Sequence, residues 1–169
     1  MTDFLIAEAG IRQLHSRCVD AVWRKDAAAF GDCFTEQGEW RISGMILKGR
    51  DHIAQTFGAI MGSFEQVLMN FQPPALEVGD SAASGRTYTT ELSAFANGER
   101  TLAIGNYYER YVLEGTRWRF SWRLFHLHYL GPTDLSGSYF KNPDYGPPPA
   151  MPGLDEESPD HSGMGASNS

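Results

Sequence analysis

Arginines and histidines interrupt an otherwise apolar and aromatic stretch, WRFSWRLFHLHYL, at residues 118–130. Its alternating aromatic and branched residues predict a β-strand, in which successive side chains lie on opposite faces. Strict alternation assigns one face to Arg119, Ser121, Arg123, Phe125, Leu127 and Tyr129. A strand that is apolar on both faces and still holds cations suits a position between an enclosed pocket and a second packing surface, such as another subunit.

Arg123 is the most informative of these cations. It stands between Ser121 and Phe125 on a face predicted to point inward, where an unpaired guanidinium is costly. It therefore either pairs with a carboxylate from a helix or holds an anionic or developing-oxyanion group of a ligand. The sequence leaves both readings open.

A histidine on the first predicted helix is the candidate general base. His15, Val19 and Trp23 recur at intervals of four along one edge of a helix predicted from about Phe4 to Lys25. If that edge faces the pocket, His15 can accept a proton near neutral pH. The alternative is a half-buried histidine bonded to a backbone carbonyl.

Metal and cofactor signatures are weak. His126 and His128 share a spacing that some metal sites use, but nothing marks a third ligand. The motifs GxxxxGK[ST], GxGxxG, CxxC and HExxH are absent. We therefore predict neither a metal site nor a cofactor, and we read the histidine pair as an interface or surface feature.

Charge and composition narrow the partners. The net charge of −7 over 169 residues is concentrated after Lys141, where acids occur without any Lys or Arg. The nearly neutral remainder argues against nucleic acid or an anionic membrane. No apolar run is long enough to span a bilayer and no secretion signal is visible. Cys18 and Cys33 then read as buried thiols of a cytoplasmic protein.

The order of predicted elements indicates an α+β fold. Helices come first, and Asp26 is placed to cap the second of them. Further segments are predicted as a third helix at Asp51–Met61 and as strands at Glu39–Ser43, Val67–Val78, Gly85–Ala96 and Thr101–Leu113. Residues 1–141 form the predicted domain. Residues 142–169, rich in Pro, Gly, Ser and acids, form a tail that is either flexible or packed on a neighbouring subunit.

Two stretches carry a family resemblance. The chain resembles SnoaL-like proteins of the nuclear transport factor 2-like superfamily in IRQLHSRCVDAVWRKDAAAFGDCFTEQGEWRISGMILKGRDHIAQTF and in GNYYERYVLEGTRWRFSWR. The resemblance implies a cone: a strongly curved antiparallel sheet wrapped around three N-terminal helices, with a deep apolar pocket. It also implies a homo-oligomer, either a dimer or a trimer, and a hydrophobic small molecule as partner.

The resemblance implies site residues and also a departure. Scytalone dehydratases and hexachlorocyclohexane dehydrochlorinases use an Asp–His pair, but Trp23 stands at the Asp position and Leu68 or Met69 at the His position. Arg123 matches the dehydrochlorinase pocket arginine. The pocket-lining positions are predicted as Val19, Trp23, Trp40, Leu68, Asn70, Thr90, Phe125 and Leu127, and Tyr88 is predicted to point inward beside them.

Three functions remain open. In the first, the protein is a cofactor-free lyase or isomerase acting on a hydrophobic ring compound, with His15 as base and Arg123 and Tyr88 stabilising an enolate-like oxygen. In the second, it is a ligand-binding or accessory module without chemistry, as the missing dyad favours. In the third, it is similar to the small subunit of ring-hydroxylating dioxygenases. Fold alone cannot decide among them.

Overall fold

The computed structural model describes residues 3–140. The predicted domain boundary at 141 and the predicted tail at 142–169 lie outside the described residues. Within the described part, no helix is both long and apolar enough to cross a membrane.

The helices begin and end as the sequence predicts. Asp26 caps the second helix, its carboxylate accepting a hydrogen bond from Ala29 N at 2.9 Å. Ile11, Leu14 and Cys18 form the buried stripe of the first helix, which satisfies the period of an amphipathic helix. The three helices of the described residues are α1 (Phe4–Arg24), α2 (Ala27–Asp32) and α3 (Arg50–Met61).

A single mixed sheet contains the strands of residues 3–140. They are β1 (Phe34–Ile42), β2 (Met45–Lys48), β3 (Phe64–Phe71), β4 (Ala75–Val78), β5 (Ala82–Phe95), β6 (Arg100–Glu114), β7 (Arg117–Gly131) and β8 (Ser138–Tyr139). The order is β2-β1-β7-β6-β5-β3, with β4 on β5 and β8 on β7. Neighbours are antiparallel except β1 and β7, which are parallel. The predicted strand 67–78 is divided in two because Pro73 and Pro74 cannot donate to a ladder.

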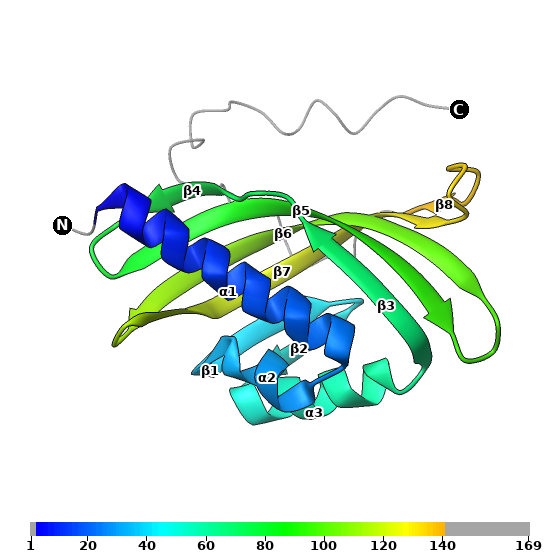
Figure 1. Cartoon of the computed structure of the whole chain (residues 1–169), viewed down its shortest axis with the longest axis horizontal. Coiled ribbons are helices and arrows are strands. Elements are labelled where there is room, and N and C mark those ends of the chain that lie inside the picture. Colours follow the sequence, from blue (N-terminus) through cyan, green and yellow to red (C-terminus); the bar gives the residue numbers. More distant parts are fainter. Residues whose placement is uncertain (1–2, 141–169) are drawn as a thin grey trace.

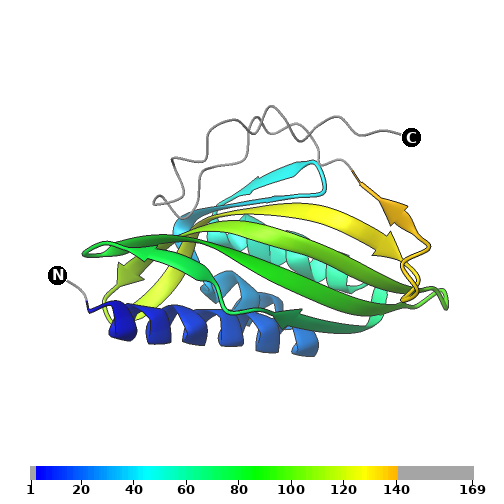
Figure 2. The ribbon, with the colours of Figure 1, turned by 90° about the horizontal axis from the view of Figure 1, so that it is seen from above.

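The sheet curves around the helices as a cone. In Figure 1 the long strands β5, β6 and β7 arch over α2 and α3, and α1 runs across the open side near β3. Figure 2 shows β2 at one edge of the curved sheet and α1 beside the opposite edge, which β3 forms. Aromatic rings pack between α2 and α3, where Phe30 and Phe57 stack with centroids 4.0 Å apart. The predicted α+β fold with a curved, mostly antiparallel sheet is confirmed.

An extra residue in β7 changes which side chains point inward. Tyr111 pairs with Phe120 and Arg110 pairs with Trp122, so Ser121 is a bulge. Trp118 and Phe120 are buried before the bulge, and Arg123 is buried after it. The predicted sharing of one face by Arg119 and Arg123 is therefore wrong. Arg119 lies on the other face, where it pairs with Asp32 at 2.8 Å.

A second bulge separates the two histidines of β7. Ile104 pairs with Tyr129 and Gly105 pairs with Leu127, which leaves His128 as the extra residue. His128 is exposed, and its Nε2 lies 2.6 Å from Asn106 Oδ1. Strict alternation consequently does not hold at His126 and His128. Among residues 3–140, no group of three or more His, Cys, Asp or Glu side chains could hold a metal ion.

We expect Gly105→Ala to destabilise the sheet by about 1–3 kcal/mol through overpacking. A Cβ at Gly105 would lie 2.4 Å from the His126 carbonyl oxygen and 2.6 Å from the Phe125 ring. Urea unfolding followed by circular dichroism measures the effect. Gly62→Ala, at the helical end of α3, is the matched control and should cost much less. Equal losses would contradict this packing.

Candidate functional site

A buried carboxylate, Glu109, organises the polar groups inside the cone. It lies on β6 and is inaccessible to solvent. Its Oε1 accepts a hydrogen bond from Arg123 Nε at 2.8 Å. Its Oε2 accepts one from Tyr111 Oη at 2.6 Å and lies 2.9 Å from His15 Nε2. One carboxylate thus joins β6, β7 and α1.

The charges of this cluster stabilise one another. Burial alone would raise the pKa of Glu109, but its electrostatic interactions with His15 and Arg123 and its hydrogen bonds with His15 and Tyr111 lower that pKa to about 2. Burial opposes the charge of Arg123, yet Glu109 raises the pKa of Arg123 above its ordinary value. Glu109 is therefore ionised and Arg123 protonated.

The pairing with Glu109 decides what neutralises Arg123: a carboxylate of the protein does so, and no anionic ligand is needed for it. Its partner is a carboxylate, as one reading predicts, but it comes from a strand and not from a helix. The guanidinium also stacks over Tyr107, with its carbon 3.8 Å from the ring centroid. Nη2 lies 2.7 Å from Glu109 Oε1 as an ionic contact and has no hydrogen-bond partner among residues 3–140. Arg123 thus keeps one unmatched donor.

His15 is fixed by the same carboxylate. An ionised carboxylate only accepts hydrogen bonds, so Nε2 of His15 carries the proton that it shares with Glu109. Its Nδ1 is buried without a partner within the described residues. As a base His15 could use only Nδ1, and its side chain borders an outer groove and not the interior cavity.

Two thiols lie beside Arg123, and both are free and buried, as predicted. Arg123 Nη1 is 3.5 Å from Cys18 Sγ. The neighbouring Cys33 thiol, acting against burial and together with the charge of Arg123, lowers the pKa of Cys18 to about 7. The same thiol contact and burial raise the pKa of Cys33. Cys18 is thus the more easily ionised thiol.

The interior cavity of the cone measures about 240 Å³. Trp40, Phe125 and Leu127 line it, as the sequence predicts, and so does Arg123. Most of the wall is apolar. Further lining residues are Cys18, Val22, Phe57, Met61, Met69, Thr89, Glu91, Ser93, Ala103, Tyr107 and Leu130.

Sequence reasoning missed two acids on the inner face of the sheet: Glu109 is buried, and Glu91 lines the cavity. Glu109 lies in YYERY, where it shares the alternating face of Tyr107 and Tyr111, and this alternation was the available signal. Glu91 faces the cavity from β5, between Thr89 and Ser93. Its Oε1 accepts a hydrogen bond from Ser93 Oγ at 2.7 Å. For Glu91, too, the alternation along its strand was the only sequence signal that it points inward.

An outer groove of about 610 Å³ collects a second group of predicted residues. Val19, Trp23 and Asn70 border it together with His15. Trp23 is half-exposed, and its Nε1 donates to the Met69 carbonyl oxygen at 2.9 Å. The positions expected for an Asp–His dyad are therefore joined here by an indole and a backbone oxygen.

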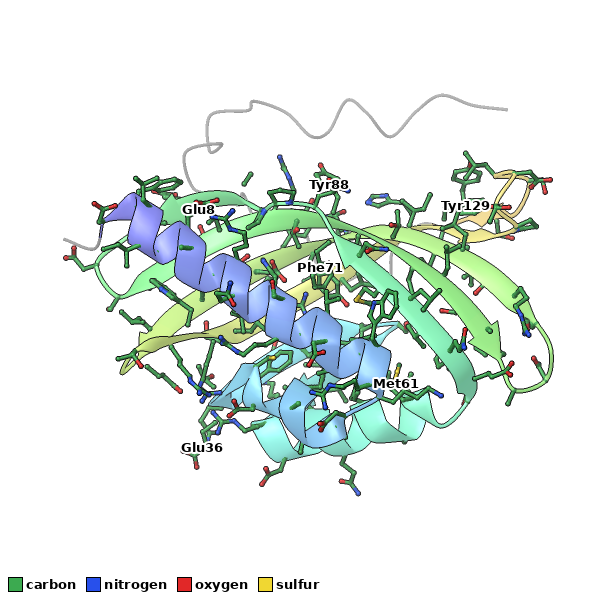
Figure 3. The ribbon with its side chains drawn as sticks, viewed as in Figure 1. Glu8, Glu36, Met61, Phe71, Tyr88 and Tyr129 are labelled. Atoms are coloured by element: carbon green, nitrogen blue, oxygen red, sulfur yellow. The ribbon has the colours of Figure 1, made fainter. Side chains whose placement is uncertain are left out.

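Three predicted residues lie elsewhere. Tyr88 and Thr90 occupy the outer face of β5, because Thr87, Thr89 and Ser93 take the buried face. Figure 3 shows Tyr88 on the side of the sheet away from α2 and α3. Leu68 borders a separate depression at the sheet edge. The predicted inward orientation of Tyr88, Thr90 and Leu68 is wrong, and Tyr88 does not join Arg123.

Known proteins share this fold. A family model described as the SnoaL-like domain matches residues 3–123. A variant of a protein of unknown function from Mycobacterium tuberculosis is 24% identical, over 73% of this chain and 77% of its own, with a TM-score of 0.68. A type 2 hexachlorocyclohexane dehydrochlorinase is 20% identical, over 82% and 95% of the two chains, with a TM-score of 0.70.

A third structure, from Novosphingobium aromaticivorans, is assigned provisionally as a scytalone dehydratase. It is 14% identical, over 80% of this chain and 93% of its own, with a TM-score of 0.71. At these identities the likeness shows the fold alone, which is the cone of the nuclear transport factor 2-like superfamily. No curated protein sequence matches the chain.

We expect Glu109→Gln to lower the free energy of unfolding by about 3–5 kcal/mol, because it leaves a buried Arg123 without its counter-charge. Glu65→Gln is the matched control: it removes the acid of the exposed Glu65–Arg100 pair and should cost less than about 1 kcal/mol. Urea unfolding at neutral pH measures both. Similar losses in the two variants would refute a special role for Glu109.

Acid should remove the Glu109 contribution in a defined range. The pKa of Glu109 is lowered from 4.5 to about 2 on folding, so its stabilisation is complete above the higher value and disappears as the pH falls through the lower one. The difference corresponds to about 3 kcal/mol. Unfolding free energies of wild type and Glu109→Gln should therefore converge as the pH falls from 5 to 2. A constant gap would contradict this linkage.

Proposed function

From the premise that this chain belongs to the SnoaL-like domain family, we propose that it binds a small, mostly apolar, neutral molecule carrying one carbonyl-type oxygen in the cavity of the cone. The observation that carries the proposal is a set of unmatched hydrogen-bond donors on an otherwise apolar wall. An apolar pocket with a few placed polar groups is the usual form of a small-molecule site.

The donors come from neighbouring strands. Trp40 and Arg123 are register partners on β1 and β7, and Trp40 Nε1 and Arg123 Nη2 are buried without hydrogen-bond partners among residues 3–140. Tyr107 adds a hydroxyl for which no hydrogen bond is found in the same part of the chain. Because unpaired buried donors are costly, an oxygen of a ligand would relieve them.

Size and charge restrict the ligand. A cavity of about 240 Å³ lies at the small end of ligand pockets and favours a one- or two-ring compound. Glu109 already neutralises Arg123, and Glu91 faces the same space. A neutral ketone should therefore bind better than a carboxylic acid of the same shape.

A non-catalytic binding role is the second candidate function. The pairing of both His15 and Arg123 with Glu109 favours it over a mechanism with His15 as the base. A family name also carries no activity by itself. The expected homo-oligomer stays a prediction, which analytical ultracentrifugation would test.

Binding of 2-tetralone, a two-ring ketone, tests the proposal by isothermal titration calorimetry. We expect saturable binding, with at least about tenfold weaker binding of 2-naphthoate because its charge is repelled. Ala103→Leu fills the cavity wall and should abolish ketone binding, whereas Ala59→Leu on the exposed side of α3 should not. Absence of saturable binding, or equal effects of the two substitutions, would contradict the proposal.

A further inference from the structure

Glu91 is the only carboxylate among the described residues that line the interior cavity, and it lies outside the Glu109 cluster. Its only hydrogen bond within residues 3–140 comes from Ser93 Oγ, and no cation pairs with it there. Glu109, in contrast, is held by Arg123, His15 and Tyr111. The two acids thus have different environments: Glu109 is saturated by cations and donors, whereas Glu91 retains lone pairs that face the cavity.

The environment of Glu91 suits proton transfer. Burial raises its pKa, and the hydrogen bond from Ser93 only partly offsets this. A carboxylate in apolar surroundings is a stronger base than one in water, and a pKa nearer neutrality favours general acid–base catalysis. The other titratable groups on the described wall are Cys18 of α1, Tyr107 of β6 and Arg123 of β7.

Tyr107 lies between Glu91 and the Arg123 end of the cavity. On β6 it stands between Ala103, the register partner of Glu91, and Glu109, the partner of Arg123. Burial raises the pKa of Tyr107, and the charge of Glu91 contributes to the rise, which places the two side chains in the same electrostatic neighbourhood. The Tyr107 hydroxyl therefore stays protonated and can donate a hydrogen bond.

We infer that Glu91 is the proton acceptor for a carbonyl compound whose acidic carbon lies next to the carbonyl group, and that the Tyr107 hydroxyl binds the resulting oxyanion. The inference rests on the proposed ligand-binding function. Both residues face one apolar cavity, and each has bonding capacity that the described protein leaves unused.

The step balances without a redox partner. The Glu91 carboxylate takes the proton, so a C–H bond breaks and an O–H bond forms. The electron pair of the C–H bond becomes the enolate, whose oxygen accepts a hydrogen bond from Tyr107. Return of the proton from Glu91 to the same carbon gives exchange, and return to a conjugated carbon gives isomerisation.

Exchange of 2-tetralone hydrogens for deuterium, followed by NMR in heavy water, tests this inference. We expect exchange above the buffer rate with the wild type, and a loss of about 100-fold or more in Glu91→Gln with unchanged ketone binding. Tyr107→Phe should also slow exchange. Glu99→Gln, the same substitution at an exposed turn, should leave the rate unchanged.

The outcomes separate the two proposals. Ketone binding without exchange, or exchange that survives Glu91→Gln, overturns the role of Glu91 and leaves the binding function standing. Absence of ketone binding overturns the proposed function itself.

Two measurements keep the inference testable if Glu91→Gln does not fold. Carbon-13 NMR of labelled glutamate side chains should give Glu91 a higher titration midpoint than exposed Glu99, and an equal or lower midpoint overturns the inference. Ser93→Ala removes the hydrogen bond that lowers the pKa of Glu91, so the rise of the exchange rate with pH should move to higher pH. An unmoved profile also overturns the inference.

Discussion

The ion pair between Glu109 and Arg123 is the constraint on which the interior depends. Neither group could be buried alone, because an isolated charge inside a protein is too costly. Arg123 reaches Glu109 only because Ser121 bulges from β7 and returns the strand to the inward register after Phe120. His15 and Tyr111 complete the carboxylate, so α1 is fixed to the sheet by the same group. The bulge in β7 and the position of α1 are therefore both coupled to one buried charge.

The two acids on the inner face of the sheet have different roles: Glu109 holds the structure together, and Glu91 lines the cavity. Glu109 has strong partners on both of its oxygens, and a group so stabilised in its ionised form is a poor base. Glu91 lies on the neighbouring strand β5, and the only side-chain group within residues 3–140 that donates to its carboxylate is the Ser93 hydroxyl. Glu109 and Glu91 can therefore lie on one sheet with different roles. Glu109 stays ionised and stabilises the fold, and Glu91 can take up a proton on the cavity side.

Sequence patterns predicted the helices better than the strand faces, for a physical reason. The stripe of α1 and the Asp26 cap are local features, and both are present. Strand faces depend on counting by two, and one bulged residue inverts the count without a sequence signal. On β5 the polar residues Thr87 and Thr89 turn inward because their hydroxyls bond to the Gln72 and Asn70 carbonyl oxygens beside the β3–β4 break. Tyr88 is thereby placed outside, against what its hydrophobicity suggests.

The relation between Trp23 and Met69 bears on where chemistry can occur in this chain. The indole of Trp23 donates to the Met69 carbonyl oxygen, so these positions make a structural contact between α1 and β3 and offer no proton acceptor. His15, next along that edge, gives its Nε2 hydrogen to Glu109. The α1–β3 side of the cone is thus committed to holding the fold together. The candidate groups for proton transfer inside the cavity are instead Glu91 on the adjacent strand β5 and Tyr107 on β6.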